Sequence, residues 1–124
     1  MLNKSSLLNF SGSETFTKYG PIVLTEGMVY VAKNGGSTAG AGAFWLLDIA
    51  TSYRFVPAVK RESFQVYKLT KNKTGSGAVV TVEDGNDNVV HTQDIPYTDF
   101  DFANGGDTFT FWLTDGTALL PSEY

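Results

Sequence analysis

The spacing of apolar residues changes near Ser63, and this change limits the folds that the chain can adopt. Between residues 25 and 53, apolar residues recur every three or four positions, which is typical of helices packed on a core, whereas residues 10–25 predict one or two short extended segments broken at Pro21. From Ser63 onward they alternate with polar residues, which is typical of strands. Turns rich in Gly, Asn and Asp separate these strands. We therefore expect an α+β fold, with a two-helix segment packed on a four- to five-stranded antiparallel meander sheet.

The first half of the chain predicts two helices. One begins after Thr25, a favourable N-cap, and ends at the Asn-Gly-Gly sequence of residues 34–36. The other spans residues 43–53. Residues 34–42 between them are rich in Gly and Ala, which predicts a flexible interhelical loop. The side chains of the second helix that we expect to cover the sheet are Phe44, Trp45, Leu47 and Ile49.

The second half predicts the strands. Their expected ranges are 64–69, 78–82, 89–97, 108–114 and 118–120. Phe109, Phe111 and Trp112 should supply the sheet side of the core. Pro121 lacks an N–H and should end the last strand, which leaves Leu119 and Leu120 beside it. We expect at least one of these leucines to be buried in the core.

The length of 124 residues predicts a single domain, residues 1–124, in which residues 1–9 are flexible. Its 17 aromatic rings (9 Phe, 6 Tyr, 2 Trp) are enough for a large core. The chain has no Cys, which excludes disulfides, thiolate metal sites and Cys nucleophiles. Because no apolar run resembles a signal peptide or approaches the ~20 residues of a membrane span, we expect a cytoplasmic protein without a membrane partner.

The charges of the chain are strongly segregated. Residues 1–73 carry nine basic and four acidic groups, a balance of +5, whereas residues 74–124 carry nine acidic groups and no basic one, a balance of −9. The sum is the net charge of −4. Asymmetry of this kind concerns binding partners more than the fold.

Three segments together resemble a family of short uncharacterised proteins from bacteria, plasmids and phages. They are Thr-Glu-Gly at 25–27, Ala-Phe-Trp-Leu-Leu-Asp at 43–48 and Leu-Leu-Pro-Ser-Glu-Tyr at 119–124. The resemblance implies no established activity and therefore assigns no catalytic residue. The association of such proteins with mobile elements implies an accessory role, such as inhibition of a host defence protein.

The acidic second half contains the candidate binding site. Carboxylates and aromatic rings are interleaved over residues 94–107. A row of carboxylates on a rigid sheet can imitate the phosphates of nucleic acid, and aromatic rings can anchor it in a partner's groove. The sequence therefore favours a small non-enzymatic module that binds a host protein, itself a candidate nucleic-acid-binding protein. The residues of this predicted acidic face are Asp94, Asp99, Asp101, Asp107, Tyr97, Phe100 and Phe102.

Catalytic, metal and nucleotide motifs are weak. His91, the single histidine, has no nucleophile beside it, so we interpret it as a half-buried structural residue. Asp84, Asn86 and Asn88 have the opening spacing of a calcium loop, but Ile95 occupies the position of the bidentate Glu, and a hairpin turn explains these residues better. We therefore predict no metal and no cofactor.

Two alternatives remain open. Basic residues between positions 54 and 73, interleaved with aromatic rings, favour nucleic-acid binding, but the pI of about 4.7 makes direct binding the weaker interpretation. The other alternative is a small-molecule-binding or hydrolytic domain with its pocket near the 34–42 loop. Its polar groups would be Glu26, Asp48, Tyr53 and His91.

Overall fold

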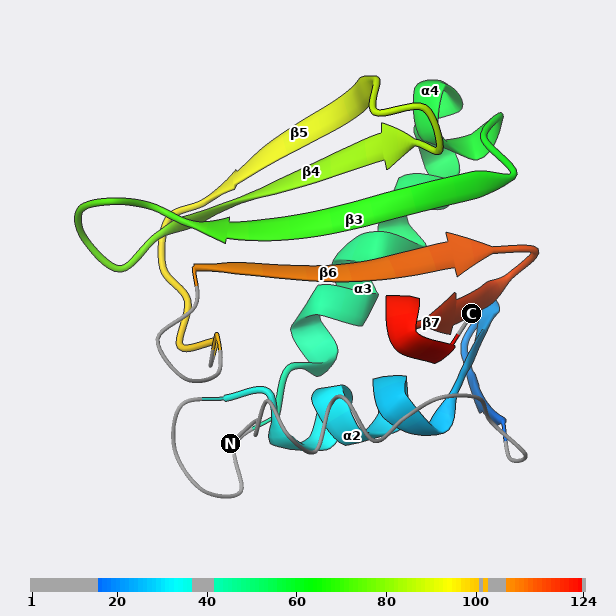
Figure 1. Ribbon diagram of the computed structural model, residues 1–124, viewed down its shortest axis with the longest axis horizontal. Helices are drawn as coiled ribbons and strands as arrows, with labels where there is room; N and C mark the ends of the chain where they lie inside the picture. The colour runs from blue at the N-terminus through cyan, green and yellow to red at the C-terminus, as the bar shows by residue number, and fades with distance from the viewer. Residues whose placement is uncertain (1–15, 37–41, 101, 103–106, 124) are drawn as a thin grey trace.

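The computed structural model describes residues 16–36, 42–100, 102 and 107–123 (Figure 1). The flexibility expected of residues 1–9 concerns positions outside this described part, as does that of residues 37–41 within the predicted 34–42 loop. The strands are β1 Thr17–Tyr19, β2 Ile22–Leu24, β3 Phe64–Lys71, β4 Ala78–Asp84, β5 Val89–Ile95, β6 Thr108–Thr114 and β7 Thr117–Leu119. The helices are α2 Glu26–Asn34, α3 Phe44–Ser52 and α4 Pro57–Lys60, with 3₁₀ turns η1 Tyr53–Phe55 and η2 Pro121–Glu123.

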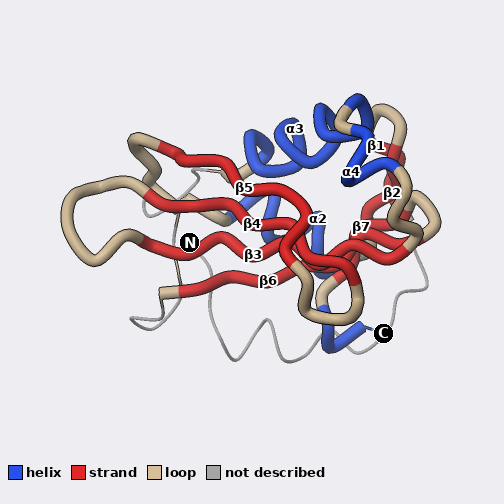
Figure 2. The backbone as a smooth tube through the Cα atoms, turned by 90° about the horizontal axis from the view of Figure 1, so that it is seen from above, coloured by secondary structure: helices blue, strands red, loops and turns tan. Residues whose placement is uncertain are grey.

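The expected fold class is wrong, because the sheet has more strands than predicted and is not purely antiparallel. The strands form one seven-stranded sheet in the order β1-β2-β7-β6-β3-β4-β5, and it is mixed because β2 pairs with β7 in parallel. In the described part of the chain three short helices accompany it, and strands outweigh helices (Figures 1 and 2). The two-helix segment on a four- to five-stranded antiparallel meander is therefore replaced by a larger mixed sheet.

The meander prediction failed because the connection between β5 and β6 is long. Twelve residues, 96–107, separate edge strand β5 from β6, which pairs with the side of β3 that does not face β4. Neighbouring strands pair when short loops join them, and a connection of this length removes that constraint. The short segments β1 and β2 then extend the sheet beyond β7.

Both predicted helices are present and begin close to where the sequence places them. The Thr25 hydroxyl accepts a hydrogen bond from the Met28 N–H at 3.3 Å and caps α2, which ends before Gly35. The third helix, α4, was not predicted. It begins at Pro57, whose fixed φ and missing N–H suit the first position of a helix.

The helices α3 and α4 lie on one side of the sheet, and the core fills the space between (Figure 2). Tyr67 and Leu69 of β3 face this core with Phe111 of β6, whereas Phe64 and Trp112 meet on the opposite face, with ring centres 5.1 Å apart. Trp112 therefore does not join Phe109 and Phe111 as expected, because alternate residues of a strand point to opposite faces.

The second helix meets the core with most of the expected side chains: Leu47 is buried, and Trp45 and Ile49 are partly buried against the core. Leu46, Leu47 and Ala50 of α3 are buried, whereas Phe44 is 40% exposed and stacks on Tyr19 of β1 at 5.6 Å. The apolar side chains around this helix cover more than half of its circumference. Their spacing alone therefore did not identify every member of the buried stripe.

The carboxylate of Glu123 joins the start of α2 to the end of β7. Its Oε1 accepts hydrogen bonds from the Thr25 hydroxyl at 2.6 Å and from the Leu120 N–H at 2.9 Å, and its Oε2 accepts one from the Gly27 N–H at 3.1 Å. Leu119 and Leu120 are both buried, and Leu120 belongs to the core, as predicted. A buried acceptor thus satisfies an otherwise unpaired N–H at the first turn of α2.

We expect Glu123→Ala to lower the free energy of unfolding by about 2–4 kcal/mol, because it leaves three buried donors without their acceptor. Urea denaturation measures the change. Ser122→Ala, at an exposed neighbour in the same 3₁₀ turn, is the matched control and should stay within ~0.5 kcal/mol of the wild type. Equal unfolding midpoints for the two variants would show that the carboxylate has no structural role.

Gly27→Ala should be destabilising, although a Gly-to-Ala change in a helix is ordinarily stabilising by roughly 0.5–1 kcal/mol. A methyl group at this position would lie 2.6 Å from Oε1 of Glu123 and 2.7 Å from Cδ1 of Leu120. The effect should therefore diminish in the Glu123→Ala background, which removes the first of these contacts. Denaturation of both single variants and of the double variant tests this coupling, and strict additivity would contradict it.

Candidate functional site

The predicted acidic face lies along the long connection between β5 and β6, residues 96–107, which we call the strap. Three backbone interactions hold the strap at the end of the sheet. The Thr98 N–H donates to the Ser76 carbonyl at 2.8 Å, the Lys71 N–H donates to the Asp107 carbonyl at 2.7 Å, and Phe100 forms a β-bridge with Gly36. The strap is thereby attached to the β3–β4 hairpin and to the end of α2.

Several polar members of the acidic face are accessible. Asp94 on edge strand β5 and Asp107 at the start of β6 are exposed, Asp99 is half-buried, and the Tyr97 ring is 72% exposed. Asp101 lies outside the described residues. An exposed aromatic side chain among carboxylates is the arrangement that the sequence analysis anticipated for a protein-binding surface.

Phe100 has a different role from the one predicted. Its side chain is 5% exposed, and its ring lies 5.0 Å from that of Phe109 and 5.1 Å from that of Phe102. Phe102 is partly buried against the same core. The two phenylalanines therefore fix the strap to the domain, because a ring packed in the core is not available to a partner. Tyr97 is the accessible ring of this region.

The strap also borders a recess of about 240 Å³ between itself and the β3–β4 hairpin. Lys71 and Asp99 contribute opposite charges to its walls, and Gly75, Ser76 and Gly77 contribute the hairpin turn. The acidic region is therefore not uniformly negative, because a lysine of the basic half lies within it.

The polar groups of the alternative pocket are not gathered. Tyr53 and His91 do meet, with ring centres 4.5 Å apart in an edge-to-face contact, and His91 is half-buried as predicted. Asp48, however, accepts a hydrogen bond from the Tyr19 hydroxyl at the surface, and Glu26 lies in the first turn of α2. None of these four residues lines the pocket described next.

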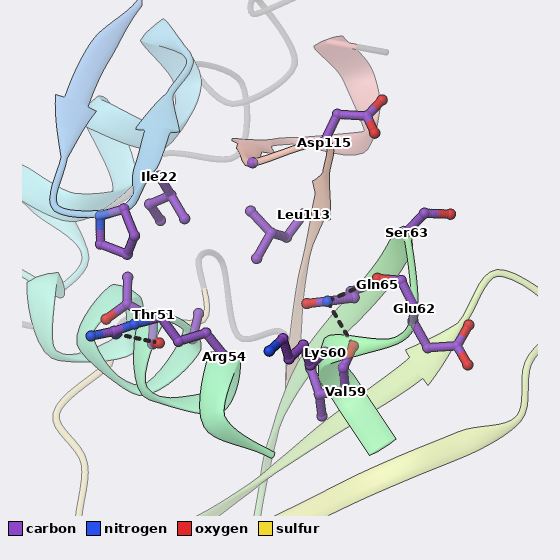
Figure 3. Close-up of a pocket in the computed structure, with 13 residues that line it drawn as sticks. Ile22, Thr51, Arg54, Val59, Lys60, Glu62, Ser63, Gln65, Leu113 and Asp115 are labelled. Atoms are coloured by element: carbon purple, nitrogen blue, oxygen red, sulfur yellow. Dashed lines mark hydrogen bonds between the residues drawn. The ribbon is translucent and has the colours of Figure 1, made fainter. Parts of the chain in front are cut away.

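A pocket of about 280 Å³ lies between the helical segment and the sheet (Figure 3). Apolar side chains form much of its wall, and polar side chains surround its mouth. The sequence analysis did not predict it, because its residues come from six elements (β2, α3, η1, α4, β3 and β6) and the turns beside them, and share no motif. Its lining residues are Pro21, Ile22, Ala50, Thr51, Arg54, Val59, Lys60, Glu62, Ser63, Gln65, Leu113, Asp115 and Gly116.

The calcium-like spacing at 84–88 is a hairpin turn, as the sequence favoured. Oδ1 of Asp84 accepts hydrogen bonds from the N–H groups of Asn86 and Asn88 at 2.9 and 3.0 Å, and Oδ2 accepts one from the Asn88 side chain at 3.1 Å. The Asn88 side chain and these two N–H groups lower the pKa of Asp84. Within the described ranges, no three His, Asp or Glu side chains are placed to hold a metal ion.

Comparison with models of known protein families shows which family the chain belongs to. A family model described as a family of unknown function (DUF6876) matches residues 1–124. The chain belongs to this family. Searches of curated proteins and of solved structures found no match. No helix in the described part of this family member is long and apolar enough to cross a membrane.

The structure brings together two of the segments on which the family resemblance was based. Thr25 and Gly27 come from the first segment, and Glu123 comes from the last, and the three residues form the hydrogen-bonded contact at the start of α2. Thr25, Gly27 and Glu123 of this DUF6876 member therefore have a structural role.

A row of stacked rings crosses the core beneath α3. Tyr67 lies 4.8 Å from Phe111 and 6.2 Å from Tyr53, both in parallel stacking. Burial raises the pKa of Tyr53 to about 12 and also raises that of Tyr67. The hydroxyl of Tyr53 donates to Gln93 and that of Tyr67 to Gln65, so both phenols are held in the neutral form.

Stability should fall between about pH 10 and pH 12, because unfolded tyrosines titrate near 10 and the native state retains the Tyr53 proton to about 12. In this window the native state binds more protons than the unfolded state, so a rise in pH favours unfolding. Tyr53→Phe should make the decline shallower in urea denaturation over this range. Tyr97→Phe, at the exposed ring, is the control, and identical slopes for both variants would contradict the assignment.

Proposed function

We propose that this family member is a non-enzymatic protein-interaction module that binds a basic surface of a partner through its acidic face. The observation that carries the proposal is the exposed Tyr97 ring, three residues after the exposed Asp94 of β5, with Asp107 also exposed at the other end of the strap. Tyrosine combines a large contact area with a hydroxyl, and it is enriched at protein interfaces. The neighbouring carboxylates supply charge complementarity and accelerate association with a basic partner.

The position of β5 supports the same proposal. Its single partner in the sheet is β4, so one side of its backbone faces away from the ladder. An edge strand offers N–H and C=O groups to an extended segment of another chain. Asp94 and the nearby Tyr97 would then select a segment with basic side chains. Because stable interfaces bury about 800 Å² on each partner, the contact must extend from the strap onto this edge.

The class of partner follows from the charge of the site and from the family resemblance. A basic groove that ordinarily receives phosphates fits a row of carboxylates, so the proposed partner is a host protein that binds nucleic acid. The resemblance to proteins of bacteria, plasmids and phages supports an inhibitor carried by a mobile element and active in the cytoplasm. In this proposal the module blocks the partner's binding site and performs no chemistry.

Charge reversal at the acidic face tests this proposal. Wild-type protein on beads is expected to retain one protein from a host lysate, and Asp94→Lys/Asp99→Lys should reduce its retention at least tenfold without changing the melting temperature by more than a few degrees. The control is Asp48→Lys/Glu62→Lys, which produces the same net charge on the helical side of the domain. Retention lost equally by both variants would mean that net charge, and not the acidic face, governs capture.

The captured partner then allows a sharper measurement. Its affinity for the purified module should fall as salt rises, because counterions compete with the ion pairs at the interface. Tyr97→Ala should weaken binding by about 2 kcal/mol if the ring is an anchor. Unchanged affinity for Tyr97→Ala would place the contact elsewhere on the molecule.

A further inference from the structure

The pocket between the helical segment and the sheet has the features of a small-ligand site. Its volume of about 280 Å³ approaches the lower end of the range of ligand pockets, roughly 300–1,000 Å³. Ile22 of β2 and Leu113 of β6 point into it from the sheet side, and Val59 of α4 contributes to the opposite wall (Figure 3). An apolar body of a few carbon atoms therefore has surfaces to contact on both sides.

The floor of the pocket is held in place by hydrogen bonds. Gln65 donates from Nε2 to the carbonyls of Val59 at 3.0 Å and Glu62 at 3.1 Å, and its Oε1 accepts from the Tyr67 hydroxyl. The amide thus links β3 to α4 and to the residues that follow it. A ligand does not need to order these elements on binding, which lowers the entropic cost of association.

The charges at the pocket favour an anion. The ammonium group of Lys60 extends toward the pocket interior, whereas the carboxylates of Glu62 and Asp115 point away from it (Figure 3). Within the described residues, no ion pair joins a carboxylate to Lys60 or to Arg54. The Arg54 guanidinium donates to the Thr51 carbonyl at 2.8 Å and lies 4.2 Å from the centre of the Phe55 ring, which holds a second positive charge beside the mouth.

We propose that this pocket binds a small carboxylic acid with a short apolar chain or a single ring. The carboxylate lies against the Lys60 ammonium, and the apolar body occupies the space between Ile22, Val59 and Leu113. A cation of the same size would meet Lys60 and Arg54 with like charge, and a neutral molecule would gain no ion pair. The site is separate from the acidic face, so this proposal does not depend on the proposed function.

A titration with sodium hexanoate, followed by amide shifts in ¹⁵N-labelled full-length protein, tests the proposal. Shifts should concentrate at residues that line the pocket, with a Kd near ~1 mM for so small a ligand. Hexylamine, with the same chain and the opposite charge, is the matched ligand control and should leave these amides unchanged. Shifts of equal size with both compounds, or none at the pocket with hexanoate, would overturn the proposal.

Variants at two lysines test which positive charge contributes to hexanoate binding. Lys60→Met keeps the length of the side chain and removes its charge at an exposed position, so the fold should be retained. We expect the Kd for hexanoate to be roughly three to ten times higher, because the variant loses the partly desolvated ion pair between the Lys60 ammonium and the carboxylate. Lys73→Met, at an exposed lysine of the β3–β4 hairpin, should leave the Kd unchanged. Equal affinity of both variants and the wild type would overturn the role of Lys60.

Discussion

The pairing of β3 with β6 is the interaction on which the rest of the sheet depends. Seven residue pairs join these strands, from Phe64 opposite Thr114 to Thr70 opposite Thr108. On one side of this pairing lie β4 and β5, and on the other lie β7, β2 and β1. The stacked rings of Tyr67 and Phe111, 4.8 Å apart, lie across it on the core face. Because no other strand pair connects the two sets, loss of this pairing would divide the sheet.

The two candidate sites lie at opposite ends of the paired strands β3 and β6. Gln65 and Leu113, which are directly paired, contribute to the pocket at one end. At the other end, the Lys71 N–H donates to the Asp107 carbonyl, and the Thr98 N–H donates to the Ser76 carbonyl of the β3–β4 hairpin. The strap is long because the chain must travel from edge strand β5 to a central position. Its accessible acidic groups are therefore a consequence of the strand order as well as a candidate binding surface.

Local sequence signals predicted the elements better than their arrangement. The Thr25 cap, the Gly after α2 and the alternation within β3 and β4 each report on neighbouring residues, and those elements were predicted within a few residues. Strand order depends on contacts between residues far apart in the chain, so the position of β6 beside β3 left no local signal. The buried role of Phe100 was missed for the same reason, since its neighbour Phe109 lies in another element.

The segregation of charge along the chain also changes meaning once the sheet forms. Strand β3, from the basic half, lies between two strands of the acidic half, and Lys68 forms an ion pair with Glu83 of β4 at 3.1 Å. Part of the polarity seen in the sequence is therefore neutralised locally, by a pair whose carboxylate is buried and whose lysine is partly exposed. The net charge of one half of the sequence therefore does not give the net charge of one face of the folded domain. Binding at either proposed site would depend on the groups that folding leaves accessible. These are Asp94, Tyr97 and Asp107 for the acidic face and Lys60 for the pocket.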